Sequence, residues 1–262
     1  AAVVNTNSMK KIGLAGVPAT MEEFIDASKK ASPGKYTLNV SGAGDWDMLP
    51  YFWLFGGVLT DDGFTKASGY LDSEQSIAAM QKIADLHKDK VFTVKEIDGS
   101  ADAWDGIEQE YAMFFEGPWY FSSKPDFKDK GIICAPIPTY NGKSASVVGG
   151  ANVVIFKDSK HPKEAFEFVK FLLSEEVQML MLQKGQIPVL KSAVNQDTVK
   201  NDPIYSVYMK QLESARSRIP SPQASQIGTY WSDAVTSILK GEATPADALK
   251  KAASLIDAEL AK

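Results

Sequence analysis

The sequence predicts a mixed α/β fold in which β-strands and α-helices alternate along the chain. Two observations lead to this prediction. Short apolar runs rich in β-branched residues, such as "YTLNV" at 36–40, alternate with segments whose apolar residues recur at helical spacing. Residues that start or stop helices also stand at the borders of those segments. The 262 residues contain no internal repeat and no low-complexity linker, so composition marks no domain boundary.

The expected strands are apolar runs of strand length. They lie at 1–5, 36–40, 112–115 and 131–137. A further run at 146–156 is expected to form two strand pieces, because Gly149 and Gly150 interrupt it.

The expected helices are marked by residues that cap or stop a helix. Thr20 and Glu23 have the spacing of a capping box, in which each side chain satisfies an otherwise unpaired backbone N–H group. Asp72 opens another helix, and Thr244 before Pro245 is typical of the start of the last one. The helices are expected from Met21, from Asp72, and over about 162–183, 202–217, 228–240 and 245–260.

Charge and composition argue against several classes of partner. The net charge is −5 and lysines occur at most in pairs such as Lys10-Lys11, so we expect neither nucleic acid nor an anionic membrane surface as a partner. No apolar run approaches the roughly 18 residues of a membrane-spanning helix. The single cysteine, Cys134, lies in the apolar run "GIICAPIP", which predicts a small buried side chain.

Sequence motifs of common enzymes are missing. The chain has no G-x-G-x-x-G, no G-x-S-x-G and no H-E-x-x-H, and neither His87 nor His161 has an obvious catalytic partner. A glycosidase needs two carboxyl groups roughly 5–10 Å apart. Glu116, beside the turn Gly117-Pro118, is a candidate for one of them. A glycan-active hydrolase that uses Glu116 and a second carboxylate therefore stays open as an alternative.

Aromatic residues gather in three groups, which can line a sugar site or fill a core. A flat ring covers the apolar face of a sugar, while carboxylates and amides bind its hydroxyl groups. Trp231 also forms a helical apolar face with the residues three, four and seven positions later, which is typical of a core. The groups are Trp46 with Tyr51-Phe52-Trp53, then Trp119-Tyr120-Phe121, then Tyr230-Trp231.

Six stretches, taken together and in order, resemble the extracellular solute-binding proteins of carbohydrate ABC transporters, in particular the maltose/maltodextrin-binding type. The resemblance covers nearly the whole chain. It implies a periplasmic-binding-protein-like (type II) fold, in which two α/β lobes joined by crossing hinge strands close on a sugar. The stretches are "GVPATMEEFIDASKK", "LFGGVLTDDG…YLDSEQSIAAMQKIADL", "AMFFEGPWYF", "SVVGGANVVIFKDSKHPKEAFEFVKFLLSEEVQ", "KGQIPVLKSA" and "LKGEATPADALKKAASLI".

The resemblance also suggests roles for individual residues. Trp119, with Tyr120 beside it, resembles the aromatic platform of the second lobe. Tyr51 and Trp231 match a tyrosine and a tryptophan that contact sugar in the family. Leu49 stands where the family has a cleft glutamate, which leaves the particular sugar open. Candidates for the missing polar contact are Asp45, Trp46 and Glu116, and Gly149, Gly150 and Asn152 are expected to cross between the lobes beside the cleft.

The resemblance further implies how the chain is divided. Residues 1–148 and 196–262 are expected to form the second lobe, and 149–195 a segment of the first lobe. Family members carry the rest of the first lobe before the point that corresponds to Ala1, so we expect that part to be absent from this chain. Without it, the apolar face of the helix at 162–183 is expected to be exposed as a site of association.

The sequence therefore predicts a carbohydrate-binding receptor that is not an enzyme. It is expected to deliver a maltose- or malto-oligosaccharide-like sugar to the membrane subunits of an ABC importer, outside the cytoplasm and with a lipid anchor as one option. No cofactor and no metal are expected. Besides the hydrolase, a binder of a non-sugar solute with the same fold, such as a polyamine or ferric iron, stays open, as do the linkage and length of the sugar.

Overall fold

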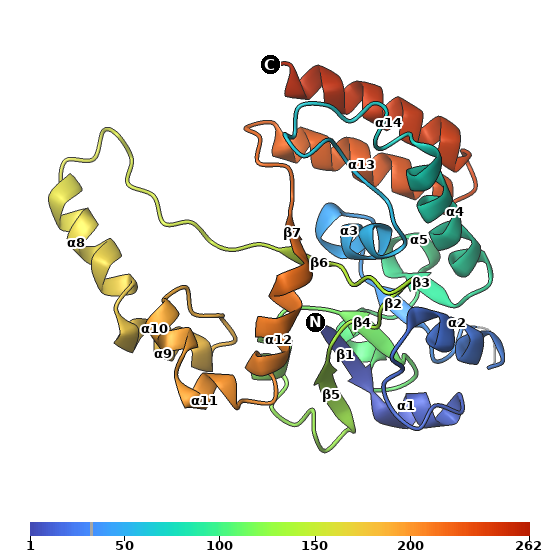
Figure 1. The fold of residues 1–262 in the computed structure, drawn as a ribbon, viewed down its shortest axis with the longest axis horizontal. Helices are drawn as coiled ribbons and strands as arrows, with labels where there is room; N and C mark the ends of the chain where they lie inside the picture. The colour runs from blue at the N-terminus through green and yellow to red at the C-terminus, as the bar shows by residue number, and fades with distance from the viewer. Residues whose placement is uncertain (32–33) are drawn as a thin grey trace.

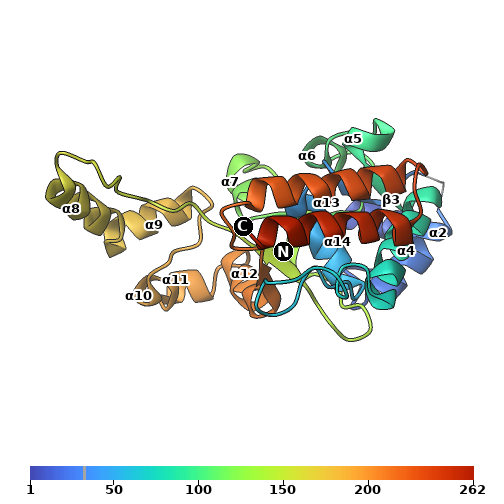
Figure 2. The same ribbon diagram turned by 90° about the horizontal axis from the view of Figure 1, so that it is seen from above.

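The computed structural model describes residues 1–31 and 34–262. Figure 1 shows a main body from which an arm extends to one side. We define the arm as residues 149–201 and the body as residues 1–148 and 202–262. Figure 2, seen from above, shows the same separation between the arm and the helices of the body. The chain leaves the body after residue 148 and re-enters it at residue 202.

The body is built on a five-stranded sheet with the order β3-β2-β4-β1-β5. Strand β2 runs parallel to both of its neighbours, whereas β1 runs antiparallel to both β4 and β5. The strands are β1 (Ala2–Asn5), β2 (Leu38–Val40), β3 (Phe92–Val94), β4 (Met113–Phe115) and β5 (Ile132–Ala135). The four predicted strands at 1–5, 36–40, 112–115 and 131–137 are thus confirmed, each with shorter bounds.

Successive residues of the sheet face two different cores. On β1, Ala2 and Val4 pack into the larger core, while Val3 packs into the smaller one. On β4, Met113 and Phe114 divide in the same way. This is the alternation expected of side chains along a strand that is covered on both faces.

Helices cover the sheet on both sides (Figure 1). The larger core is closed by α2 (Met21–Lys29), α3 (Asp45–Leu54), α4 (Glu74–Lys88), α13 (Ala224–Leu239) and α14 (Pro245–Leu260). The smaller core is closed by α6 (Ala103–Gly106), α7 (Trp119–Ser123) and α12 (Tyr205–Gln211). The short helices α1 (Thr6–Lys11) and α5 (Lys95–Asp98) and the 3-10 turn η1 (Leu212–Ser214) complete the body.

The arm leaves the body after β6 (Ser146–Val148) and returns through α12 to β7 (Ala215–Ser217), which pairs with β6 in parallel. Its helices are α8 (Pro162–Leu172), α9 (Glu175–Gln183), α10 (Lys191–Val194) and α11 (Asp197–Lys200). No side chain of α8 is buried, and residues 151–158 are all exposed. The arm meets the body near Gly185, beside Trp119 of α7. The proposed division into lobes stays a prediction.

Several predicted boundaries are wrong, some for local and some for tertiary reasons. The helix predicted over 162–183 is two helices, because Ser174 caps a new one. The helix predicted over 202–217 ends early, since residues 215–217 pair with β6 instead. The second strand piece expected after Gly150 does not form among the described residues, and residues 151–156 are exposed. The helix expected from Asp72 begins two residues later, at Glu74, with Ser73 as its N-cap.

Candidate ligand-binding site

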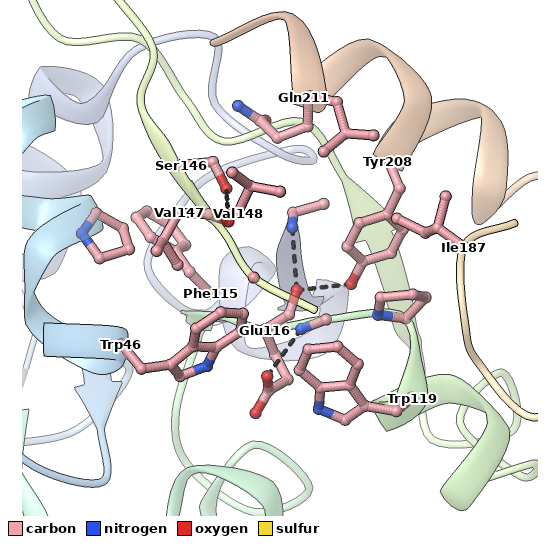
Figure 3. Close-up of a pocket in the computed structure, with 16 residues that line it drawn as sticks. Trp46, Phe115, Glu116, Trp119, Ser146, Val147, Val148, Ile187, Tyr208 and Gln211 are labelled. Carbon is pink, nitrogen blue, oxygen red and sulfur yellow. Dashed lines mark hydrogen bonds between the residues drawn. The ribbon is translucent and has the colours of Figure 1, made fainter. Parts of the chain in front are cut away.

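A pocket lies in the body beside strand β6 (Figure 3). One wall comes from the start of α3 and another from the turn between β4 and α7. Strand β6 and helix α12 close the remaining sides. The labelled lining residues are Trp46, Phe115, Glu116, Trp119, Ser146, Val147, Val148, Ile187, Tyr208 and Gln211.

Trp119 faces the pocket because of the turn that precedes it. Strand β4 ends at Phe115, and Pro118 starts the short helix α7 with Trp119 as its first residue. The indole folds back over Gly117 so closely that a Cβ atom at this position would overlap the ring. Only glycine therefore allows this placement, which gives the Gly-Pro-Trp sequence a physical reason.

Trp46 forms the second half of an aromatic platform. It lies in the first turn of α3, and its ring centre is 5.7 Å from that of Trp119 with an angle of 34° between the planes. Gly149 packs against the Trp46 ring, since a Cβ atom there would lie 2.9 Å from it. Two half-buried indoles thus present a continuous apolar surface to the pocket.

Glu116 is held in place beside this platform. Its Oε2 accepts a hydrogen bond from Nε1 of Trp104 at 3.0 Å, and its Oε1 accepts one from the backbone N–H of Gly117 at 2.8 Å. The Tyr208 hydroxyl also donates to the Glu116 carbonyl at 2.7 Å. Each carboxylate oxygen keeps further acceptor capacity, so the fixed carboxylate can accept hydrogen bonds from a bound hydroxyl group.

Asp47, next to Trp46 on α3, adds an unusual carboxyl group. Burial raises its pKa to about 7, and the negative charges of Glu116, Glu96 and Asp45 act in the same direction. Near neutral pH this carboxyl group therefore exists in both protonation states. A protonated carboxyl can donate a hydrogen bond as well as accept one. Asp47 lines neither this pocket nor the cavity that adjoins it. The sequence analysis did not single it out, because the shift depends on burial and on acids that are mostly distant in sequence.

A second cavity adjoins the first, and Val148 and Gly149 line both. It runs from the start of α3 to the first turns of α13. Asp45 lies on its wall and accepts hydrogen bonds on both carboxylate oxygens from Nη1 of Arg218, each at 3.4 Å. Gly150 also lines this cavity.

The structure brings some of the predicted site residues together and separates others. Trp46, Glu116 and Trp119 line the first pocket. The second cavity is lined by Asp45, Gly149, Gly150 and Trp231. Asn152 lies on the exposed part of the arm and lines neither. The role of these residues in binding stays a prediction.

Tyr51, Tyr120 and Trp231 are buried. Tyr51 has no exposed surface and stacks on Phe115, with ring centres 4.2 Å apart, and burial raises the pKa of its hydroxyl well above its usual value. Tyr120 is also fully buried, in the smaller core. In this conformation neither ring is available as a platform for a ligand.

Trp231 lies on the face of α13 that packs into the larger core, against Phe52, and is 1% exposed. The same face holds the residues at helical spacing from Trp231, as the apolar pattern predicts. Gly228, one turn earlier, is half-buried at the second cavity. Trp231 itself is among the residues that line this cavity, so the sugar contact that the resemblance implied for it stays a prediction.

The site also contains residues that the sequence analysis missed. Tyr208 and Gln211 of α12 face the first pocket, and Arg218 faces the second. A signal existed for the last of these, since Arg216 and Arg218 are the only arginines in the sequence. No sequence pattern marked Tyr208 and Gln211, because only the folding of the whole chain brings their helix to the pocket.

Two further observations concern metals and membranes. Among residues 1–31 and 34–262, no cluster of three or more histidine, cysteine or acidic side chains has the arrangement to hold a metal ion. Across those same residues, no helix combines the length and the apolar character needed to cross a bilayer.

The fold belongs to the periplasmic-binding-protein-like class. It matches an ABC transporter solute-binding protein of Thermotoga lettingae, solved with α-D-tagatose bound, with a TM-score of 0.84 and 27% identity. That match covers 99% of this chain and 69% of the other. The chain belongs to the family of bacterial extracellular solute-binding proteins, whose family model matches residues 1–207.

Two curated relatives place the chain in the same family. A maltotriose-binding protein of Pyrococcus abyssi is 30% identical over 143 residues, which are 51% of this chain and 31% of the relative. A probable ABC transporter-binding protein of Deinococcus radiodurans is 22% identical over 94% of this chain and 63% of the relative. The chain thus spans less than two thirds of the length of either relative.

Proposed function

We propose that the chain is the greater part of a carbohydrate receptor that delivers a malto-oligosaccharide-like sugar to an ABC importer. The observation that carries the proposal is the platform of Trp46 and Trp119, with the fixed carboxylate of Glu116 at its edge. A pyranose ring has an apolar face and a rim of hydroxyl groups. The two indoles fit the face and the carboxylate fits the rim.

We propose a role without catalysis. Both oxygens of Glu116 accept hydrogen bonds from groups that hold it in place, which suits a fixed acceptor better than an acid that must exchange a proton. A hydrolase would release smaller sugars from an oligosaccharide during long incubation with the purified protein. Product formation that persists in the wild type and stops in Glu116→Gln would support the hydrolase and overturn the receptor.

We further propose that residues 149–195 belong to a first lobe that is completed by polypeptide outside this chain. The exposed apolar side chains of the arm support this, because they form a surface that water contacts unfavourably. Sugar between two lobes would favour their closed arrangement, since it would contact both. We also propose that this receptor delivers the sugar to the transporter outside the cytoplasm and that a lipid anchors it there.

Tryptophan fluorescence titrations with maltose, maltotriose and trehalose test the proposal. We expect weak binding by the chain alone and tighter binding when the first-lobe segment is supplied from the full natural protein. Trp119→Ala is expected to lower affinity by about 30-fold, which corresponds to about 2 kcal/mol of apolar contact. Tyr70→Ala, an exposed aromatic outside both cavities, serves as the control. No response to any of the sugars in either sample would refute the sugar receptor.

A further inference from the structure

Each of the two arginines lies over a tryptophan of α3. The guanidinium of Arg216, on β7, is 5.8 Å from the ring centre of Trp53. Arg218, just beyond β7, is likewise 5.8 Å from the ring centre of Trp46. Residues two apart on an extended strand share a face, and residues seven apart on a helix do so as well. The two contacts are therefore similar in geometry.

Their surroundings differ. Trp53 is 6% exposed and belongs to the larger core, so its orientation is fixed by packing on several sides. Trp46 is half-buried at the pocket and contacts the ring of Trp119. Arg218 additionally donates to the carboxylate of Asp45, the residue before Trp46. One arginine covers a core tryptophan, and the other covers a tryptophan of the proposed platform.

Arg218 is also tied to the strands that lead to the arm. Strand β7 pairs with β6, with Val148 opposite Ser217, the residue before Arg218. Directly after Val148, Gly149 packs against the Trp46 ring. Trp46 is thus contacted by Gly149 after one crossing strand, by Arg218 after the other, and by Trp119.

We propose that Arg218 is a positioning residue, which sets the orientation of Trp46 and links the geometry of the platform to the crossing strands β6 and β7. The inference rests on the proposed function, since the platform matters only if a ligand uses it. A change in the relative position of the strands would move the guanidinium and Gly149, and therefore the indole between them. Binding at the platform and movement of the strands would then influence each other.

The chemistry of the arginine side chain allows the positioning role of Arg218 to be tested. A guanidinium is planar and stacks on an indole while it donates to a carboxylate, whereas a lysine ammonium keeps the charge but has no flat surface. Arg218→Lys therefore retains the charge near Asp45 and loses the stacked contact. Arg216→Lys makes the same change over Trp53 and is the matched control, because Arg216 lines neither the pocket nor the second cavity.

The experiment has two readouts, taken on the wild type, both lysine variants and Trp46→Phe. The first is the near-ultraviolet circular dichroism of the ligand-free protein, which reports the coupled indoles of Trp46 and Trp119. The second is maltotriose affinity. We expect Arg218→Lys to reduce the coupled signal toward that of Trp46→Phe and to lower affinity by about tenfold. Arg216→Lys is expected to keep both the signal and the affinity within about twofold of the wild type.

Each remaining outcome is decisive. An unchanged dichroism signal in Arg218→Lys overturns the inference, and if affinity falls at the same time, Arg218 contacts the sugar directly. Equal loss of signal in both lysine variants also overturns it, because the effect would then belong to the strand as a whole. If the wild type binds none of the sugars, the proposed function fails, while the dichroism comparison still decides whether Arg218 positions Trp46.

Discussion

The body and the arm use the same kinds of residue with opposite results. Phe24 and Phe92 of the body are fully buried, whereas Phe156 of the arm is 81% exposed and Phe168 of α8 is 58% exposed. Both regions contain well-capped helices, so local signals are satisfied in each. The difference shows that an amphipathic pattern is enough to form a helix, while burial of its apolar face requires a partner surface.

The body and the arm also differ in how much stabilisation they gain from apolar burial. Full burial of a phenylalanine side chain contributes roughly 1.5–3 kcal/mol. The body has already gained this contribution at its core positions, and the exposed phenylalanines of the arm have not. The arm is therefore the part of the molecule that gains most from association, and the body is the part whose stability depends most on each core side chain.

The largest expected effect separates the two regions directly. Phe24→Ala should lower the free energy of unfolding by about 3–5 kcal/mol, because it leaves a cavity in the larger core. Phe166→Ala, on the exposed face of α8, should change it by less than about 0.5 kcal/mol. Urea unfolding followed by circular dichroism measures both. A large loss from Phe166→Ala would mean that the arm packs on something in solution, for instance a second copy of the chain.

The next effect concerns a charge buried in the body. The pKa of Asp47 rises from 3.8 to about 7 on folding, so between these values the folded state holds a proton that the unfolded state has released. Stability from this group therefore decreases as pH rises from about 4 to about 7 and is constant above that. Asp47→Asn should be more stable than the wild type by up to about 4 kcal/mol at high pH, with no advantage below about pH 4.

Thermal unfolding of the wild type and Asp47→Asn across this pH range checks the prediction. Asp158→Asn is a suitable control, because Asp158 lies on the exposed part of the arm. Parallel pH profiles for the wild type and Asp47→Asn would show that Asp47 is not the group responsible.

A smaller effect on the free energy of unfolding is expected when one polar contact is removed from each region. Asp257 of α14 accepts backbone hydrogen bonds from Ala67, at 2.5 Å, and Ser68, at 3.3 Å, which fixes a loop of the body. Asp257→Asn should cost about 1.5 kcal/mol. Glu167 of the arm pairs with Lys170 at 2.6 Å on an exposed helix face, and Glu167→Gln should cost less than about 0.5 kcal/mol. Similar losses in the two variants would contradict the contrast between body and arm.

Some features of this protein were determined by the sequence alone. The capping box of Thr20 and Glu23 is present, and Thr244 caps the last helix as predicted. The turn before Trp119 was recognisable because Pro118 restricts the backbone and Gly117 leaves room for the ring of Trp119. These predictions held because each depends on groups only a few residues apart, whose geometry the chain sets within one turn.

Other features were decided only by the tertiary structure. Residues 215–217 became a strand because β6, far away in sequence, offered them a pairing edge. The packing of α13 buries Trp231 in the larger core and also places it at the edge of the second cavity. The pKa of Asp47 and the contact between Arg218 and Trp46 likewise join segments that are distant in sequence. Such contacts depend on how the whole chain is arranged, which no local pattern of residues determines.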